Sequence, residues 1–393
     1  MSQSKLKRYL IPITITIIIL IVTIILIPIS LGNITFPPTT DTKPNIPTIT
    51  SPYSTPELLW TQNIDRSVSD LVVADGVIYI NAAWRGLLYA FNATDHTKMW
   101  TYGFGIYDKV APPAIANNIV YVQTTSIFYA LNATNGTKIW TYDAEGDSSP
   151  VVVDDIVYFG SASSGLNTEN TETQHGVIFA LNATNGTTIW TYQTNDASIK
   201  SVPVVANNIV YIASGRMDNR ELYALNAKNG NFIWKTPIGA SYDLSPTVAN
   251  GIVYIGSEDT LYALNATTGK EIWTYTTNSN IGTPTIEYGV AYVISQDQNI
   301  YALNAANGKK LWSYPIGENN IMSGLAVADG VIYIGCYTRY NQALYALSAA
   351  SGKKLWSYPI GCTTPTITDD TLYISSGNDI YAFTTIKPLK PSP

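Results

Sequence analysis

One repeat unit of this chain is visible in two nearby stretches, SSPVVVDDIVYFG at residues 148–160 and GVIFALNATNGTTIWTY at residues 176–192. Together they contain four short apolar runs, rich in β-branched and aromatic residues, with turn residues between them. These residue types favour strands, and short strands at regular spacing indicate an all-β fold. The runs are apolar on both faces more than they alternate, which is typical of a sheet that is covered on both sides.

The unit recurs along most of the chain. Its fourth run contains a tryptophan, and such tryptophans lie 39 to 50 residues apart, at Trp60, Trp100, Trp140, Trp190, Trp234, Trp273, Trp312 and Trp356. Eight aromatic–alanine pairs mark the third run in the same phase. A period of about 40 residues with four strands per unit is typical of a β-propeller. The sequence therefore predicts an eight-bladed β-propeller over residues 57–386.

The two ends of the repeat region complement each other. Trp60 stands ahead of the first complete unit, whereas the last unit ends at Phe383 without a tryptophan of its own. An open ring would leave two unpaired sheet edges. We therefore expect the N-terminal strand around Trp60 to close the ring as the fourth strand of the last blade.

A recurrent spacing links the third and fourth runs. In the second unit it is Ala130–Trp140 (ALNATNGTKIW), with alanine, asparagine, glycine and tryptophan at fixed intervals. This pattern resembles the tryptophan-docking motif of the quinoprotein (PQQ)-like repeat propellers, in which each tryptophan stacks between adjacent blades. The resemblance covers the whole repeat region and implies that all eight tryptophans are structural. Two units depart from it, with His96 in place of glycine and Ser348 in place of asparagine.

The N-terminus is predicted to anchor the protein in the cell membrane as a single-pass transmembrane helix. Residues 9–31 (YLIPITITIIILIVTIILIPISL) carry no charge, and about 20 apolar residues span a bilayer core. Three basic residues precede them, which places a cytoplasmic tail, residues 1–8, inside and the propeller outside. A cleaved signal peptide is the alternative. Residues 32–56, rich in proline and threonine, are expected to form an extended stalk, and residues 387–393 a disordered tail.

The composition argues against several classes of function. The formal net charge is −6, which does not suit a nucleic-acid partner. Two cysteines and two histidines, without a CxxC pair, do not suit a zinc site. PQQ-dependent dehydrogenases resemble this fold, and that resemblance implies a calcium site and a catalytic aspartate, but no motif here allows them to be carried over. We therefore predict no catalytic residue, no cofactor and no metal, with a PQQ-dependent dehydrogenase as the alternative.

Binding is expected on one face of the ring. In a propeller, the loops after the second and the fourth strand of each blade share a face. Exposed aromatic residues and arginine dominate interfaces, and Trp84 is the one tryptophan outside the docking series. The candidates are Trp84, Arg85, Tyr107, Asp108, Arg216, Arg220, Tyr242, Asp243, Tyr337, Arg339 and Tyr340. For any single candidate, an ordinary solvated loop residue is the simpler interpretation.

These features favour a non-catalytic module that binds proteins or serves as a scaffold at the membrane. In size and in lacking cofactor motifs it resembles the BamB-like propeller lipoproteins of the outer-membrane barrel-assembly machinery. It departs from them in its membrane helix and in having no lipid-attachment cysteine. A propeller that binds a surface glycan through aromatic loop residues is a further alternative.

Two covalent modifications are also predicted. Cys336 and Cys362 fall at the same face of adjacent blades, so a disulfide is possible outside the cytoplasm, with buried thiols as the alternative. Asn135 and Asn185 stand in Asn-x-Thr sequences and are the candidates for N-glycosylation. Both coincide with the docking turn, where asparagine and threonine are favoured in any case.

Overall fold

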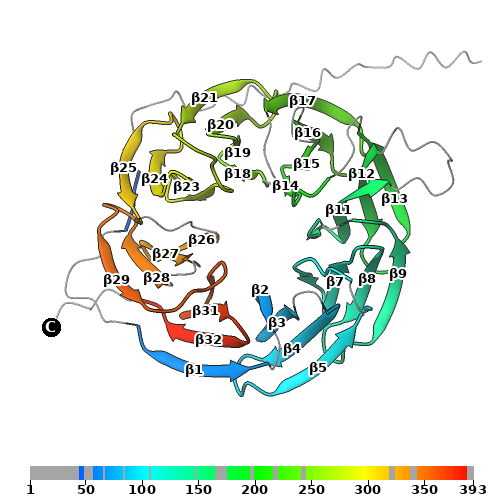
Figure 1. Ribbon diagram of the computed structural model, residues 1–393. Helices are drawn as coiled ribbons and strands as arrows, with labels where there is room; N and C mark the ends of the chain where they lie inside the picture. The colour runs from blue at the N-terminus through cyan, green and yellow to red at the C-terminus, as the bar shows by residue number, and fades with distance from the viewer. Residues whose placement is uncertain are drawn as a thin grey trace, which may run out of the picture. The chain divides into compact units, whose positions relative to one another are not determined.

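The computed structural model describes residues 44–47, 56–64, 67–82, 85–105, 108–146, 148–163, 175–194, 199–215, 220–239, 245–317, 324–336 and 343–386. Within these residues the strands form eight antiparallel sheets of four strands each, arranged like blades around a central opening (Figure 1). The eight-bladed propeller predicted from the repeats is thus confirmed.

In blades 1 to 4 the strands pair in sequence order, with the first strand nearest the central opening (Figure 1). Blade 1 holds β2 (Val68–Ala74), β3 (Val77–Ala82), β4 (Leu87–Asn92) and β5 (Lys98–Gly103). Blade 2 holds β6 (Ala114–Ala116), β7 (Ile119–Gln123), β8 (Ile127–Asn132) and β9 (Lys138–Asp143). Blade 3 holds β10 (Val151–Val153), β11 (Ile156–Ser163), β12 (His175–Asn182) and β13 (Thr188–Gln193). Blade 4 holds β14 (Val204–Ala206), β15 (Ile209–Ser214), β16 (Arg220–Asn226) and β17 (Phe232–Gly239).

Blades 5 to 7 repeat this order, and blade 8 combines the two ends of the repeat region. Blade 5 holds β18 (Thr247–Ala249), β19 (Ile252–Ser257), β20 (Thr260–Asn265) and β21 (Glu271–Thr276). Blade 6 holds β22 (Thr285–Glu287), β23 (Val290–Ile294), β24 (Asn299–Asn304) and β25 (Lys310–Pro315). Blade 7 holds β26 (Leu325–Ala328), β27 (Val331–Cys336), β28 (Ala343–Ser348) and β29 (Lys354–Tyr358). Blade 8 holds β30 (Thr366–Thr368), β31 (Thr371–Ser376), β32 (Asp379–Thr384) and β1 (Leu58–Asn63).

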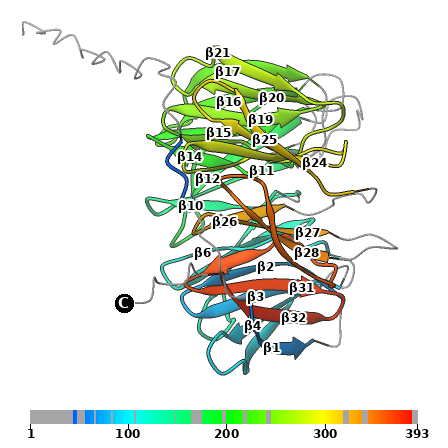
Figure 2. The same cartoon turned by 90° about the vertical axis from the view of Figure 1, so that its left-hand side faces the viewer.

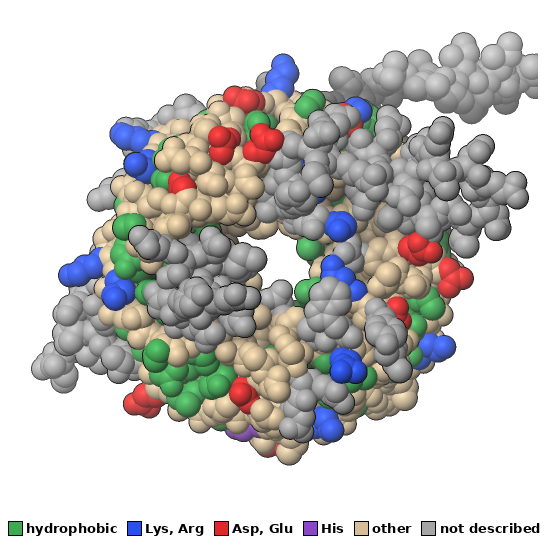
Figure 3. Space-filling view, viewed as in Figure 1, with side chains coloured by type: hydrophobic (Ala, Val, Ile, Leu, Met, Phe, Trp, Pro, Cys, Tyr) green, Lys and Arg blue, Asp and Glu red, His purple; other side chains and the backbone are tan. Residues whose placement is uncertain are grey.

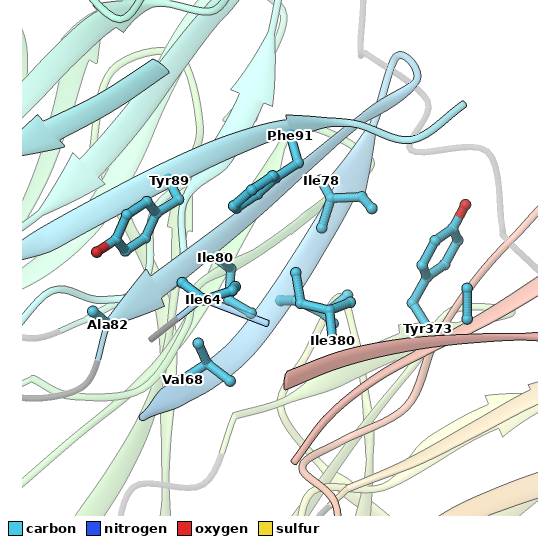
Figure 4. Packing of buried hydrophobic residues seen from close by; sticks show 11 residues of the cluster. Ile64, Val68, Ile78, Ile80, Ala82, Tyr89, Phe91, Tyr373 and Ile380 are labelled. Atoms are coloured by element: carbon cyan, nitrogen blue, oxygen red, sulfur yellow. The ribbon is translucent and has the colours of Figure 1, made fainter. Parts of the chain in front are cut away.

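The ring closes through a strand from the N-terminal side. β1 pairs antiparallel with β32, with Trp60 opposite Ala382, and blade 8 has the strand order β1-β32-β31-β30. Figure 4 shows the apolar side chains at this junction, where Tyr373 and Ile380 of blade 8 belong to one cluster with residues of blade 1. The predicted closing strand is therefore confirmed, and it pairs the edge that β32 would otherwise expose.

The two innermost strands of most blades are joined by tight turns with left-handed backbone. Asn117 and Asn118, for example, have φ values of 51° and 61°, and residues 154–155 and 207–208 are alike. Positive φ at both turn positions is the geometry of a type I′ hairpin, whose twist suits the strands that it joins. The turn also sets the register, which places Ala116 opposite Ile119.

The outer-strand tryptophans tie neighbouring blades together. Six of them donate the Nε1–H to an alanine carbonyl of the next blade, in the pairs Trp100–Ala133, Trp140–Ala183, Trp190–Ala227, Trp234–Ala266, Trp273–Ala305 and Trp312–Ala349. The docking glycine of the next blade lies against the indole ring. A Cβ placed on Gly308, for instance, would stand 2.6 Å from Cε3 of Trp273. A residue without a side chain is therefore required at this point, where φ is also positive.

The junctions on both sides of blade 8 differ from the other six. The ring of Trp60 packs at a tilt of 33° against the ring of His96, with ring centroids 4.2 Å apart, so the histidine that replaces glycine in the first unit lies against the closing strand. Within the residues that the structure describes, the buried Nε1 atom of Trp356 has no hydrogen-bond partner. In blade 8 the third and fourth strands, β32 and β1, come from opposite ends of the repeat region, so no docking turn joins them. Trp356 therefore packs against blade 8 without a docking turn of the kind found in the other blades.

Because of this asymmetry, Trp356→Phe and Trp273→Phe are expected to lower the free energy of unfolding by different amounts. Both changes replace an indole by the smaller phenyl ring. Trp273→Phe also removes the hydrogen bond to the Ala305 carbonyl, whereas Trp356→Phe removes a buried donor that has no partner among the described residues. Since leaving a buried donor unpaired costs about 1–3 kcal/mol, Trp273→Phe should lower the free energy of unfolding by at least about 1 kcal/mol more than Trp356→Phe. Urea denaturation of the two variants measures the difference. Equal losses would argue against this description of the closing junction.

Tyrosines on the second strands of blades 2 to 6 add a second hydrogen bond at the same carbonyls. The Tyr121 hydroxyl donates to the Ala183 carbonyl at 3.1 Å, where Trp140 also donates. The same arrangement is found for Tyr158, Tyr211, Tyr254 and Tyr292. Burial, the largest cause, raises the pKa of Tyr121, Tyr158 and Tyr211 to about 12. Ionising these hydroxyls would require charge in the interior of the junctions.

The propeller is therefore expected to lose stability steeply in strong alkali. A tyrosine whose pKa is higher in the folded than in the unfolded state contributes stability that is complete below the ordinary pKa of 10. That contribution is lost as the pH rises through about 12, and several junctions lose it together. Urea midpoints should stay level up to about pH 10 and then fall. Tyrosinate absorbance should rise together with unfolding, and ionisation of these tyrosines in a folded propeller near pH 10 would contradict the expectation.

Part of the predicted stalk lies against the propeller. Residues 44–47 are described, and Ile46 packs on the apolar cluster at blades 6 and 7, while Pro47 lies beside Gly330 in the β26–β27 turn. This contact is on the face of the inner hairpin turns. The predicted tail, membrane helix and C-terminal tail lie outside the described residues, and within those residues no helix has the length and apolar character needed to cross a membrane.

Candidate functional site

Two sets of connections emerge on one face of the propeller: those between the second and third strands, and those that lead from the fourth strand to the next blade (Figures 1 and 2). We call this the loop face. Figure 3 shows that it is hollowed at the centre, with lysine and arginine side chains beside the opening. The structure describes three of the predicted binding residues, Arg85, Asp108 and Arg220. The others lie outside the described residues: Trp84, Tyr107, Arg216, Tyr242, Asp243, Tyr337, Arg339 and Tyr340.

The two connections of blade 1 touch each other at the loop face. Phe104 N donates to the Gly86 carbonyl at 2.7 Å, and a Cβ on Gly86 would collide with the Gly105 carbonyl. Arg85, next to Gly86, is exposed, and Asp108, three residues after Gly105, is half-buried. The structure thus brings Arg85 and Asp108 onto adjoining connections, as the propeller topology predicts. Arg220 begins β16 in blade 4 and is half-buried.

A carboxylate of blade 6 near the same face is held by hydrogen bonds. Asp297 accepts hydrogen bonds from the Tyr301 hydroxyl at 2.8 Å, from Asn299 N at 3.1 Å and from Asn278 N at 3.3 Å. Burial alone would raise the pKa of Asp297, but these bonds to the ionised form outweigh burial and lower the pKa. These hydrogen bonds hold the connection between β23 and β24 in place. Because its pKa is lowered, the Asp297 carboxylate is a weak proton acceptor.

Cys336 and Cys362 lie at the junction of blades 7 and 8. Both are buried thiols that are not joined, and a Cβ on Gly335 would stand 2.7 Å from the Cys362 Sγ. Burial raises the pKa of each thiol to about 12, and for Cys362 the neighbouring Cys336 adds to the effect. Thiols of this kind are unreactive near neutral pH, and the disulfide stays a prediction. In the described part of the chain, no three acidic, histidine or cysteine side chains gather as a metal site.

The docking turns contain asparagines that differ in exposure and in hydrogen bonding. Asn132 is half-buried, and its Oδ1 accepts bonds from Thr134 N and Asn135 N, so it holds the turn together. Asn135 is exposed, and its Oδ1 accepts bonds from Thr137 N and Oγ1. Asn185 repeats this geometry in blade 3. N-glycosylation at Asn135 and Asn185 stays a prediction, on side chains that are exposed.

A cleft between blades 3 and 4 was not predicted from the sequence. The cleft has a volume of about 180 Å³, and its lining residues are Tyr192, Gln193, Thr194, Tyr223, Phe232 and Lys235. At its edge, Lys235 Nζ lies 2.8 Å from Glu221 Oε2, which also accepts a hydrogen bond from Tyr223. Burial would raise the pKa of Glu221, but the Lys235 and Tyr223 bonds outweigh it and lower the pKa. The available signal was Lys235, which stands where the other units have threonine or serine after the docking tryptophan.

The closed ring of eight blades and the tryptophan-docking geometry define the class of protein, an eight-bladed β-propeller built from PQQ-like repeats. A family model described as outer membrane protein assembly factor BamB matches residues 53–173 and 218–321, which together are more than half of the chain. The chain therefore belongs to the BamB family.

Individual relatives show both the family and the wider fold. A stretch of 117 residues is 27% identical to the outer membrane protein assembly factor BamB of Legionella pneumophila (strain Paris), and it covers 30% of this chain and 29% of that relative. The crystal structure of BamB from Moraxella catarrhalis matches with a TM-score of 0.68 and 18% identity, over 84% of this chain and 100% of that one. Quinohemoprotein alcohol dehydrogenase from Comamonas testosteroni matches with a TM-score of 0.65 and 15% identity, over 86% and 78%. One fold thus serves an assembly factor and a dehydrogenase, so function depends on the site.

Proposed function

We propose that this protein is a non-catalytic propeller that binds proteins or serves as a scaffold, anchored in the cell membrane by residues 9–31 with the propeller outside. Membership of a family described as an assembly factor supports a role in protein binding. The observation that carries the proposal is the meeting of two connections on the loop face, with Arg85 and Asp108 on adjoining segments. Arginine is among the residues that contribute most to interfaces.

Cross-linking of the full chain in its own membranes, followed by affinity purification, tests this proposal. Arg85→Glu combined with Lys109→Glu reverses two exposed charges on the loop face. Lys228→Glu combined with Lys270→Glu is the matched control, since it reverses two exposed charges at docking turns on the opposite face. We expect a protein partner that is lost in the first variant and kept in the second. Wild-type chain without a partner, or equal loss in both variants, would refute the proposal.

A PQQ-dependent dehydrogenase is the second candidate, because a quinohemoprotein alcohol dehydrogenase shares the fold over 86% of this chain. Titration of the purified full chain with PQQ and Ca²⁺ distinguishes the two functions. The scaffold proposal requires that the absorption spectrum of PQQ stays unchanged. A saturable spectral change at micromolar PQQ would favour the enzyme instead.

A further inference from the structure

The outer strand of blade 4, β17, departs from its counterparts at two positions of the repeat. Two residues before the docking tryptophan the other units have lysine, threonine, glutamate or leucine, whereas β17 has Phe232. Directly after the tryptophan the other units have threonine or serine, whereas β17 has Lys235. Both residues line the cleft between blades 3 and 4. Because the other blades form the same sheet without them, the repeat architecture does not require these two residues.

The aromatic wall of the cleft is built from both blades. The rings of Tyr192 in blade 3 and Phe232 in blade 4 are stacked, with an interplanar angle of 17° and centroids 6.4 Å apart. Phe232 is 49% exposed, and the buried Tyr223 ring supports Tyr192 at a centroid distance of 6.0 Å. At the junction of blades 2 and 3 the residue in the place of Phe232 is Thr188, which bonds to the Tyr142 hydroxyl instead. The aromatic wall is therefore a feature of this cleft.

The polar side of the cleft is balanced in charge. The Lys235 ammonium pairs with the Glu221 carboxylate at 2.8 Å and lies 5.7 Å from the centroid of the Tyr223 ring. Since the two charges compensate each other, the cleft attracts neither anions nor cations strongly. Lys235 still offers donors, Glu221 offers acceptors, and the exposed Gln193 amide offers both. A matching ligand is neutral, with an apolar face and hydroxyl groups at its edge.

We propose that this cleft binds one pyranose ring of a neutral saccharide. The C–H bonds on the face of a pyranose carry partial positive charge and stack on the electron-rich faces of Tyr192 and Phe232. The ring hydroxyls then reach Lys235, Glu221 and Gln193. A volume of about 180 Å³ suits a single sugar ring, since pockets for larger ligands have about 300–1,000 Å³. The saccharide site lies between outer strands and is separate from the protein-binding role proposed for the loop face.

An array of neutral hexose and N-acetylhexosamine oligosaccharides, probed with the full chain in a sugar-free detergent, tests the saccharide site. Phe232→Thr with Lys235→Thr restores residues found in other units and should weaken binding at least about tenfold in NMR titrations with the best oligosaccharide. Phe232→Tyr keeps the aromatic face and should bind within about twofold of wild type. Ile272→Ala, an exposed position of blade 5 next to its docking tryptophan, is the control and should bind like wild type.

Three results would overturn the saccharide site. They are no neutral saccharide bound by wild type, unchanged binding in the double threonine variant, and a preference for acidic sugars over neutral ones. If the double variant does not fold, Gln193→Ala, at an exposed strand end, provides the same comparison. Partner cross-linking through the loop face should be unaffected by all of these variants, so the failure of one proposal is distinguishable from that of the other.

Discussion

Deleting β1, residues 58–63, is expected to lower the free energy of unfolding by about 3 kcal/mol, since it removes the half-buried Trp60 together with the whole pairing of β1 with β32. The ring of Trp60 packs against the ring of His96 in blade 1 and edge-on against Tyr373 in blade 8, so its loss removes contacts within blade 8 and to blade 1. The deletion also leaves the backbone of β32 unpaired, and such an edge pairs readily with other chains. Urea denaturation and sedimentation should therefore show a less stable protein that forms oligomers.

Leu59→Ala is the control for the deletion. Leu59 lies in the same strand but is 50% exposed, so its truncation should change stability by no more than about 0.5 kcal/mol. A deletion variant as stable and as monomeric as wild type would show that β1 does not complete blade 8.

Gly308→Ala is expected to destabilise the propeller by about 3 kcal/mol, the sum of overpacking and left-handed backbone strain. The added Cβ would stand 2.6 Å from Cε3 of Trp273, and the indole cannot move away without breaking its bond to the Ala305 carbonyl. Thermal and urea denaturation measure the loss.

Gly76→Ala separates the two causes. Gly76 has a φ of 73°, close to the 71° of Gly308, but a Cβ there would meet nothing within 4 Å. This variant should lose only the backbone part, about 1–2 kcal/mol. If Gly76→Ala and Gly308→Ala lowered the free energy of unfolding equally, the close contact with the indole ring would not be the reason for glycine in the docking turn.

The number of blades and the closing strand could be predicted because the same pattern of apolar runs and a docking tryptophan recurs eight times in the sequence. Trp60 without a preceding unit, and Phe383 without a following tryptophan, already indicated where the two ends meet. The hairpin turns were not predicted in detail, although adjacent asparagines such as Asn117 and Asn118 suit left-handed backbone and could have indicated them. These signals are local in the sequence and recur in phase.

What could not be predicted depends on contacts between blades. In the sequence, Tyr121 is indistinguishable from other aromatic strand residues. Its hydrogen bond to the Ala183 carbonyl joins two blades and could be identified only from their packing. Trp356 Nε1 has no hydrogen-bond partner among the described residues, because no docking turn joins β32 to β1 in blade 8. The cleft beside Lys235 needs side chains from two sheets, brought together by the packing of adjacent blades. Most of the predicted loop-face residues and the membrane anchor fall outside the described residues and remain predictions.

If a strand from the N-terminal side completes the last blade, Thr61 must lie opposite Tyr381, and a cross-link between the two positions measures this pairing. Facing residues on antiparallel strands have Cα atoms about 4.5–5.5 Å apart, a separation that a disulfide can bridge. In a chain with Cys336→Ala and Cys362→Ala, the pair Thr61→Cys and Tyr381→Cys should form an intramolecular disulfide on mild oxidation, seen as a mobility shift on a non-reducing gel. The control pair Thr61→Cys and Ser357→Cys should not. Failure of the first pair to cross-link, or cross-links between separate chains, would contradict the closed ring.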